Sequence, residues 1–243
     1  MNVKSILIAL VSVMLAFSAQ AQLFKKVTGN DKYVTREYKL NDFSKVNISH
    51  AFNVIYKVNP DSAGMVRVYG EENILDLMSL KSEKGILSIK LTGLRDPEFG
   101  VILIHMYSNS LISVKNEGAG TFEIQSPLDA PEISLSVIGS GQIKAERLDC
   151  GVLNLNVGGG DGDIAVKSGK VGFGDYSIQG NGEIRAQDVD AESASAVITG
   201  TGVIRLTAQK DLKTILTGSG KVYYNGKPQL KSRTVGTGQV LPL

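Results

Sequence analysis

A short phrase occurs seven times in the second half of the sequence: two glycines separated by one residue, then one further residue, then a large apolar residue. The pairs are Gly118 and Gly120, Gly139 and Gly141, Gly160 and Gly162, Gly180 and Gly182, Gly200 and Gly202, Gly218 and Gly220, and Gly236 and Gly238. Their first glycines are 21, 21, 20, 20, 18 and 18 residues apart. A period this regular predicts a stack of repeated coils rather than a set of independent motifs.

The segment after each glycine pair alternates in polarity. Ile184 and Ala186 are apolar, for example, whereas Arg185 between them is charged. A period of two is typical of a strand with one face inward and one in solvent. A second alternating segment precedes most of the pairs, as in residues 153–157. The sequence therefore predicts an all-β fold, a right-handed parallel β-helix (β-solenoid) with coils of about 18–21 residues in the C-terminal half.

The first third of the chain is less regular. Residues 43–58 and 85–93 alternate over longer stretches, and residues 73–80 have the pattern of a short helix or a turn. We expect wider, irregular coils here, so that residues 41–243 form a single solenoid domain. Residues 22–40 are expected to form a lead-in whose first strand caps the open end, since an uncapped stack invites aggregation. A separate N-terminal domain is the alternative.

Residues 1–21 have the pattern of a secretory signal peptide. A basic start at Lys4 precedes an apolar run over residues 6–17, and Ala19 and Ala21 fit a small-x-small cleavage rule. The run is too short to span a bilayer, which needs about 20 apolar residues. We therefore predict Sec-type export to the periplasm, the cell surface or the medium, with no membrane span in the remaining chain.

Charge and cysteine content exclude several classes of function. The formal net charge is +2, which gives no electrostatic basis for binding nucleic acid. Cys150 is the single cysteine, so no internal disulfide can form. With no histidine near it in sequence, we expect Cys150 to be a small buried residue rather than a nucleophile.

The glycine pairs could in principle hold a phosphate group. Phosphate cradles need a helix N-terminus after the glycines, whereas each pair here leads into an alternating strand. We therefore assign all fourteen glycines to structural turns between strands, because glycine adopts positive φ and permits close approach of two chain segments. No catalytic, cofactor-binding or metal-binding residue is predicted.

The stretch 158–164, GGGDGDI, has the composition of a calcium-binding turn, but its frame fails by one residue and no neighbouring copy supplies further ligands. Asp161 and Asp163 are interpreted as solvated turn residues, and a weak calcium site there stays open. This repeat also holds one residue more than its neighbours, which predicts a β-bulge.

The remaining polar candidates are sparse. His50 and His105 are 55 residues apart and lack a cysteine or carboxylate at ligand spacing, so both are expected to be solvent-facing strand residues rather than zinc ligands. Asp188 and Asp190 are the nearest carboxylate pair to a general acid and base, although aspartate at a corner is ordinary.

Several stretches together resemble the bacterial GIN domain family, described as "putative autotransporter adhesin, head GIN domain". They are FSKVNIS at 43–49, VYGEENIL at 68–75, GILSI at 85–89, the recurrent Gly-Ser-Gly and Gly-Thr-Gly, and YNGKP at 224–228. The resemblance implies a right-handed parallel β-helix on an exported protein, with adhesion suggested by the family name.

Three functions fit these expectations. The first is a non-enzymatic binding or adhesion module of the cell envelope, whose outward positions such as Gln142, Lys144, Glu183 and Arg185 meet a surface glycan or an envelope protein. The second is a structural scaffold that self-associates end to end. The third is a carbohydrate-active enzyme, which fold analogy alone does not support.

Overall fold

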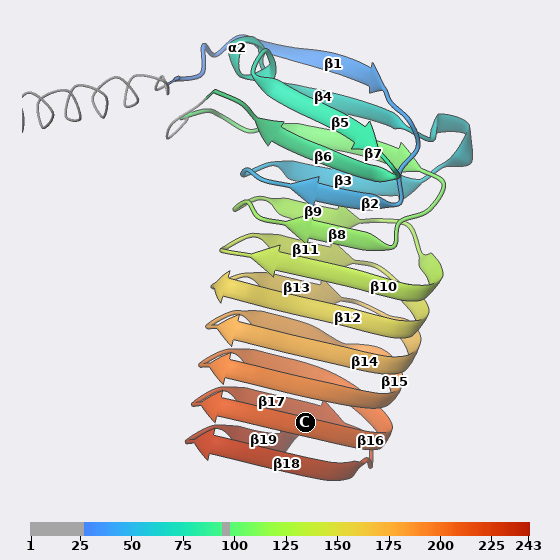
Figure 1. Ribbon diagram of the computed structural model, residues 1–243, viewed down its shortest axis with the longest axis vertical. Helices are drawn as coiled ribbons and strands as arrows, with labels where there is room; N and C mark the ends of the chain where they lie inside the picture. The colour runs from blue at the N-terminus through green and yellow to red at the C-terminus, as the bar shows by residue number, and fades with distance from the viewer. Residues whose placement is uncertain (1–26, 94–97) are drawn as a thin grey trace, which may run out of the picture.

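The computed structural model describes residues 27–93 and 98–243, and the predicted signal peptide lies outside them. The chain is nearly all β and winds into stacked parallel coils, a β-solenoid of about six turns (Figure 1). Its front strands run to the left in Figure 1 and the strands behind them run to the right as the chain descends, which is a right-handed winding. The predicted fold class is therefore confirmed. Within the described residues no helix is long and apolar enough to cross a membrane.

Each regular coil has a long front strand, a Gly-x-Gly corner and a short return strand behind it (Figure 1). The front strands are β8 (Ser113–Asn116), β10 (Leu128–Ile138), β12 (Leu148–Gly160), β14 (Gly169–Gly180) and β18 (Gln229–Gly236). The return strands are β9 (Thr121–Ile124), β11 (Gln142–Ala145), β13 (Asp163–Val166), β17 (Lys221–Asn225) and β19 (Gln239–Pro242). In β15 (Glu183–Gly200) and β16 (Val203–Gly218) a return segment continues without a break into the next front segment.

Equivalent residues of successive coils are parallel Cα partners, and their inward side chains form continuous columns. Ile143 pairs with Ile164, which pairs with Ile184. Ile184 pairs in turn with Ile204, and none of these four side chains is exposed. Burying an isoleucine contributes about 1.5–3 kcal/mol. A single coil buries none of its side chains on its own, so stability comes from the stacking of coils.

All fourteen predicted turn glycines lie at the corners between front and return strands, and the two members of a pair have different surroundings. Gly200, first of its pair, has φ +127°, a conformation that L side chains rarely adopt. Gly202, second of its pair, is buried, and a Cβ placed on it would lie 2.6 Å from Ile178 Cγ2 and 2.8 Å from the Gly182 carbonyl oxygen. The predicted bulge is confirmed by a register shift between Gly158 and Gly160.

The N-terminal end contains a rearrangement of chain order that the repeat pattern did not predict. The coil formed by β2 (Lys45–Ile48) and β3 (Asn53–Val58) lies between the coil of β6 (Ile86–Leu91) and β7 (Leu103–Ser108) and the coil of β8 and β9. The first coil in the sequence is therefore enclosed by later ones.

Above β6 and β7 the pairing becomes antiparallel. β4 (Met65–Glu71) pairs with β7, β5 (Met78–Glu83) pairs with β6, and β1 (Tyr33–Lys39) pairs with β4 at the end of the stack (Figure 1). A 3-10 turn, Pro60–Ser62, precedes β4. Helix α2 (Glu72–Leu75) follows β4 and buries Ile74 and Leu75, so it is shorter than residues 73–80, and Met78 already belongs to β5. Antiparallel strands thus cover the end of the parallel stack.

Tyr176 carries a polar atom inside the core. Its side chain is fully buried in the inward column between Leu155 and Ala196, and its hydroxyl has no hydrogen-bond partner within the described part of the chain. Gly174 makes room for it, since a Cβ there would lie 2.4 Å from the hydroxyl oxygen. The Tyr176 ring fills the interior of its coil, whereas the equivalent positions of the neighbouring coils carry the aliphatic side chains of Leu155 and Ala196.

We expect Gly202→Ala to lower the free energy of unfolding by about 2 kcal/mol, because the new methyl group overlaps Ile178 and the neighbouring backbone. Urea unfolding followed by circular dichroism measures this loss. Ser219→Ala, at an exposed position of the next corner, is the control and should change stability by less than about 0.5 kcal/mol. Equal stability of the two variants would contradict the steric role of the glycine.

We expect Tyr176→Phe to raise the free energy of unfolding by about 1 kcal/mol, because it keeps the ring and removes a buried hydroxyl without a partner. Thermal denaturation should show a higher Tm. Tyr56→Phe is the matched control: the Tyr56 hydroxyl lies 2.7 Å from Ser108 Oγ, so its removal should lower stability. The opposite order of the two variants would show that Tyr176 has a partner.

Candidate binding faces

The front face consists of the outward side chains of β5, β6, β2, β8 and the front segments from β10 to β18. Because the pairing is in register, these side chains form straight columns along the stack. The middle column holds no carboxylate. Its members, from the N-terminal end, are Lys81, Ser88, Asn47, Lys115, Ser136, Asn156, Ser177, Val197, Ile215 and Arg233.

The centre of the front face is neutral and carries small hydrogen-bonding groups. Ser136, Asn156 and Ser177 follow one another in the middle column. In the adjacent column Ser134 and Asn154 are followed by the exposed Asp175, so the neutral region is the middle column itself. The serines and asparagines stand on β strands whose inward neighbours are fully packed, so their backbone positions are fixed. Rigid hydroxyl and amide groups at regular spacing suit a ligand that carries many hydroxyl groups.

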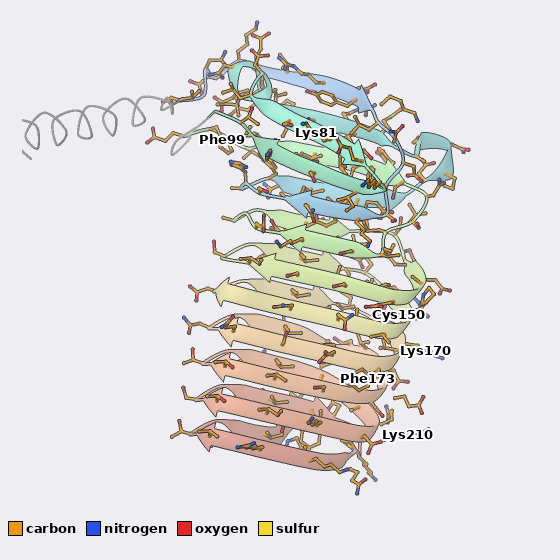
Figure 2. All side chains as sticks on the ribbon, viewed as in Figure 1. Lys81, Phe99, Cys150, Lys170, Phe173 and Lys210 are labelled. Atoms are coloured by element: carbon orange, nitrogen blue, oxygen red, sulfur yellow. The ribbon has the colours of Figure 1, made fainter. Side chains whose placement is uncertain are left out.

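A shallow groove lies at the N-terminal end of the front face. Lys81 of β5 and Lys90 of β6 line it together with Lys84 of the connecting turn. The other polar residues of its lining are Asn47, Ser79, Glu83 and Ser88. Figure 2 shows Lys81 on the front of β5. The groove therefore combines three cationic side chains with one carboxylate, that of Glu83, and neutral polar groups.

The back face, formed by the outward side chains of the return strands, has a different electrostatic character. Arg185 Nη2 donates to Asp163 Oδ2 at 2.5 Å, and Arg185 Nη1 donates to Glu183 Oε2 at 2.8 Å. Arg205 pairs with Glu183 from the next coil and lies 5.4 Å from the ring centroid of Tyr223. Arg185, Arg205, Asp163 and Glu183 thus neutralise one another across successive coils.

Asp163 is not the solvated turn residue that the sequence predicted. It is buried, with 8% of its surface exposed, because it is the first residue of β13 and packs beneath Arg185. Burial raises the pKa of the Asp163 carboxyl, and the Arg185 charge opposes this effect. Its Oδ1 atom has no hydrogen-bond partner among the described residues. The signal that sequence reasoning missed is Arg185, which stands one coil later and two positions further along the strand.

Asp161 is exposed, as predicted, and its Oδ1 accepts a hydrogen bond from Asn181 Nδ2 at 3.1 Å. The structure thus gives the two aspartates different surroundings, one in solvent and one in an ion pair. Across residues 27–93 and 98–243, no group of three or more His, Cys, Asp and Glu side chains is arranged to hold a metal ion.

The two histidines lie in separate places. His50 stands in the corner between β2 and β3, not on a strand, and stacks on Phe52 with ring centroids 5.7 Å apart. Its Nδ1 accepts a hydrogen bond from the Leu91 amide at 3.3 Å, and burial lowers the pKa of its imidazole. His105 is a half-buried residue of β7 whose Cα partners are Ile55 and Arg67.

Cys150 and the Asp188–Asp190 pair complete the predicted candidates. Cys150 is half-buried at the start of β12, and burial raises the pKa of its thiol to about 11, which disfavours the reactive thiolate. Asp188 and Asp190 are both exposed on β15, where they accept hydrogen bonds from Gln187 and Gln209 respectively. Asp190 lines a shallow surface hollow together with Lys170, Glu192 and Gln209, and Asp188 is not part of that lining.

Comparison with known proteins gives one family and several structures of the same shape. The family model that matches covers residues 42–228 and is described as "Putative auto-transporter adhesin, head GIN domain". No curated protein sequence matches the chain.

Three solved structures are similar over most of the chain. A "putative adhesin" from Bacteroides fragilis has a TM-score of 0.82 at 23% identity, covering 89% of this chain and 100% of that one. A "putative adhesin" from Parabacteroides merdae has a TM-score of 0.74 at 24% identity, covering 90% and 99%. A "putative lipid binding protein" from Parabacteroides distasonis has a TM-score of 0.71 at 25% identity, covering 90% and 100%. At 23% and 24% identity, the similarity to the two putative adhesins establishes the fold alone.

We expect Asp163→Asn to make stability less dependent on pH. Because the folded pKa of Asp163 is raised above its ordinary value of 3.8, the folded state holds its proton more tightly than the unfolded state. The wild type therefore loses stability from this group as pH rises from below 3.8 through the folded pKa. Urea unfolding at pH 3 and at pH 7 gives the unfolding free energy of Asp163→Asn and of the wild type. Relative to the wild type, the variant should be more stable at pH 7 than it is at pH 3. Asp161→Asn is the control for loss of one carboxylate. If Asp163→Asn became less stable relative to the wild type on going from pH 3 to pH 7, the prediction would be wrong.

Proposed function

Since the chain belongs to the "Putative auto-transporter adhesin, head GIN domain" family, we propose that it is an exported, non-enzymatic binding module of the bacterial cell envelope. It takes the Sec-type route to the periplasm or the cell surface and presents an extended face of the solenoid to a glycan or protein partner. The family and two of its structural neighbours are described as adhesins and a third as a lipid binding protein, none of them as an enzyme, which supports a binding role.

The observation that carries the proposal is the neutral centre of the front face. Ser136, Asn156 and Ser177 have outward, half-exposed or exposed side chains on rigid strands, and among the described residues none of the three has a charged hydrogen-bond partner. A binding site built on strands costs little conformational entropy when a ligand docks. The arginines of the back face, Arg185 and Arg205, are already engaged with carboxylates.

End-to-end self-association is the second candidate, and the last coil favours it. β18 is exposed along its whole length, with Leu230 at 39% and Val235 at 56% exposure. Among the described strands, β18 pairs with β16 and β19 pairs with β17, so the outer edge of this coil carries no strand. A second copy could add strands there.

Binding of the purified chain to arrays of surface glycans and envelope proteins tests the proposal. We expect saturable binding that the double variant Ser136→Leu, Ser177→Leu weakens by about tenfold, a loss of about 1.4 kcal/mol. The matched control is Thr121→Leu, Ala165→Leu on the back face, which should bind like the wild type. Thermal denaturation checks that all variants are folded.

Three outcomes would overturn this function. Concentration-dependent filaments that Val235→Lys abolishes, without partner binding, would establish the scaffold. Release of products from glycan mixtures would establish an enzyme. Equal loss of binding in the front-face and back-face variants would contradict the assignment of the front face.

A further inference from the structure

The front face gathers unpaired cations at both of its ends. Lys45, Lys81 and Lys90 are exposed at the N-terminal end, and Lys231 and Arg233 are exposed at the C-terminal end. Within the described part of the chain, none of the five forms an ion pair. The lysines at the N-terminal end come from β2, β5 and β6, so they are brought together by strand pairing and not by a run in the sequence.

The charges on the two faces are arranged differently although the whole chain is nearly neutral. On the back face Arg185 and Arg205 are bound by Asp163 and Glu183. On the front face the exposed acids lie in the flanking columns, and in the middle column Lys81, Lys115 and Arg233 stand among neutral residues. The exposed front-face acids are Glu83, Glu117, Glu132, Asp175 and Asp211. The cation in the middle of that column, Lys115, is paired with Glu117 at 2.5 Å.

We propose that the front face binds an acidic polysaccharide, a chain of sugars bearing carboxylates, which lies along the middle column with its anionic groups at the lysine groove. The inference rests on the proposed binding function and names the ligand class. Hydroxyl groups of the polymer meet Ser136, Asn156 and Ser177, and its carboxylates meet the unpaired cations at either end. Lysine and arginine bind carboxylates by charge-assisted hydrogen bonds.

The dimensions of the face favour a polymer over a small anion. Nine strand-to-strand steps separate Lys81 of β5 from Arg233 of β18. At ~4.8 Å for each step the two cations are about 43 Å apart. A free phosphate or a single sugar acid occupies one end, whereas an extended chain reaches both. Contacts at two ends of one polymer strengthen binding beyond either contact alone.

The test measures binding of the purified chain to polygalacturonate by isothermal titration calorimetry, with dextran as the neutral polymer. We expect binding to polygalacturonate that weakens in 0.5 M NaCl, because exposed ion pairs are screened, and no binding to dextran. The triple variant Lys45→Gln, Lys81→Gln, Lys90→Gln should bind about tenfold more weakly. The matched control, Lys57→Gln, Lys144→Gln, Lys170→Gln, removes the same charge from other exposed positions and should bind within about twofold of wild type.

The far end provides an independent readout. Lys231→Gln, Arg233→Gln should weaken binding of the polymer severalfold while leaving the affinity for a short trigalacturonate unchanged, because the short oligomer reaches only one end. Equal effects on both ligands would contradict the two-ended geometry.

Three results would overturn the acidic polysaccharide as ligand. They are equal loss in the two triple variants, binding of dextran as tight as that of polygalacturonate, and binding to vesicles containing phosphatidylglycerol without binding to polygalacturonate. A wild-type chain that binds a neutral glycan or an envelope protein through Ser136 and Ser177 would overturn this inference and leave the proposed function intact. A chain that binds none of these partners would overturn both.

Discussion

In-register parallel pairing of successive coils is the constraint on which the rest of the structure depends. The pairing places each inward side chain against its equivalent one coil away, as in the column from Ile143 to Ile204. It also requires every coil to turn at the same place. The second glycine of each pair lets the corner pass closely over the previous coil, as Gly202 does over Gly182. The same sequence repeat therefore determines both the packing of the core and the position of the corners.

The same pairing determines what the surface can do. The backbone of every coil is fixed by its neighbours, so outward side chains form columns. The residue types in these columns can differ without changing the fold. The back face uses this freedom for ion pairs between coils, from Asp163 through Arg185 and Glu183 to Arg205. On the front face, Lys81 and Arg233 at the two ends of the middle column form no ion pair within the described residues, whereas Lys115 is paired with Glu117. The inter-coil ion pairs thus lie on one side of the rod, and the column without carboxylates lies on the other.

The N-terminal end departs from the simple stack, and it does so where the lysine groove lies. The antiparallel β5–β6 hairpin closes the stack and brings Lys81, Lys84 and Lys90 together. Beneath it the β2–β3 coil supplies Asn47 and Lys45, which precede the first residue of the hairpin, Met78, by 31 and 33 residues in the sequence. The cap that protects the solenoid end is also the wall of the groove.

The sequence by itself determined the fold class, the corners and the bulge near Gly159, because period, alternation and glycine spacing are local properties that each coil repeats. It also left the glycan, scaffold and enzyme functions open, since no single motif carries chemistry. Only the tertiary structure decided that β2 and β3 lie between later coils, that Asp163 is buried under Arg185, and that His50 stands in a corner against Phe52. These features depend on which strand edges meet in space, and many sequence orders satisfy the same hydrogen bonds and the same apolar pattern.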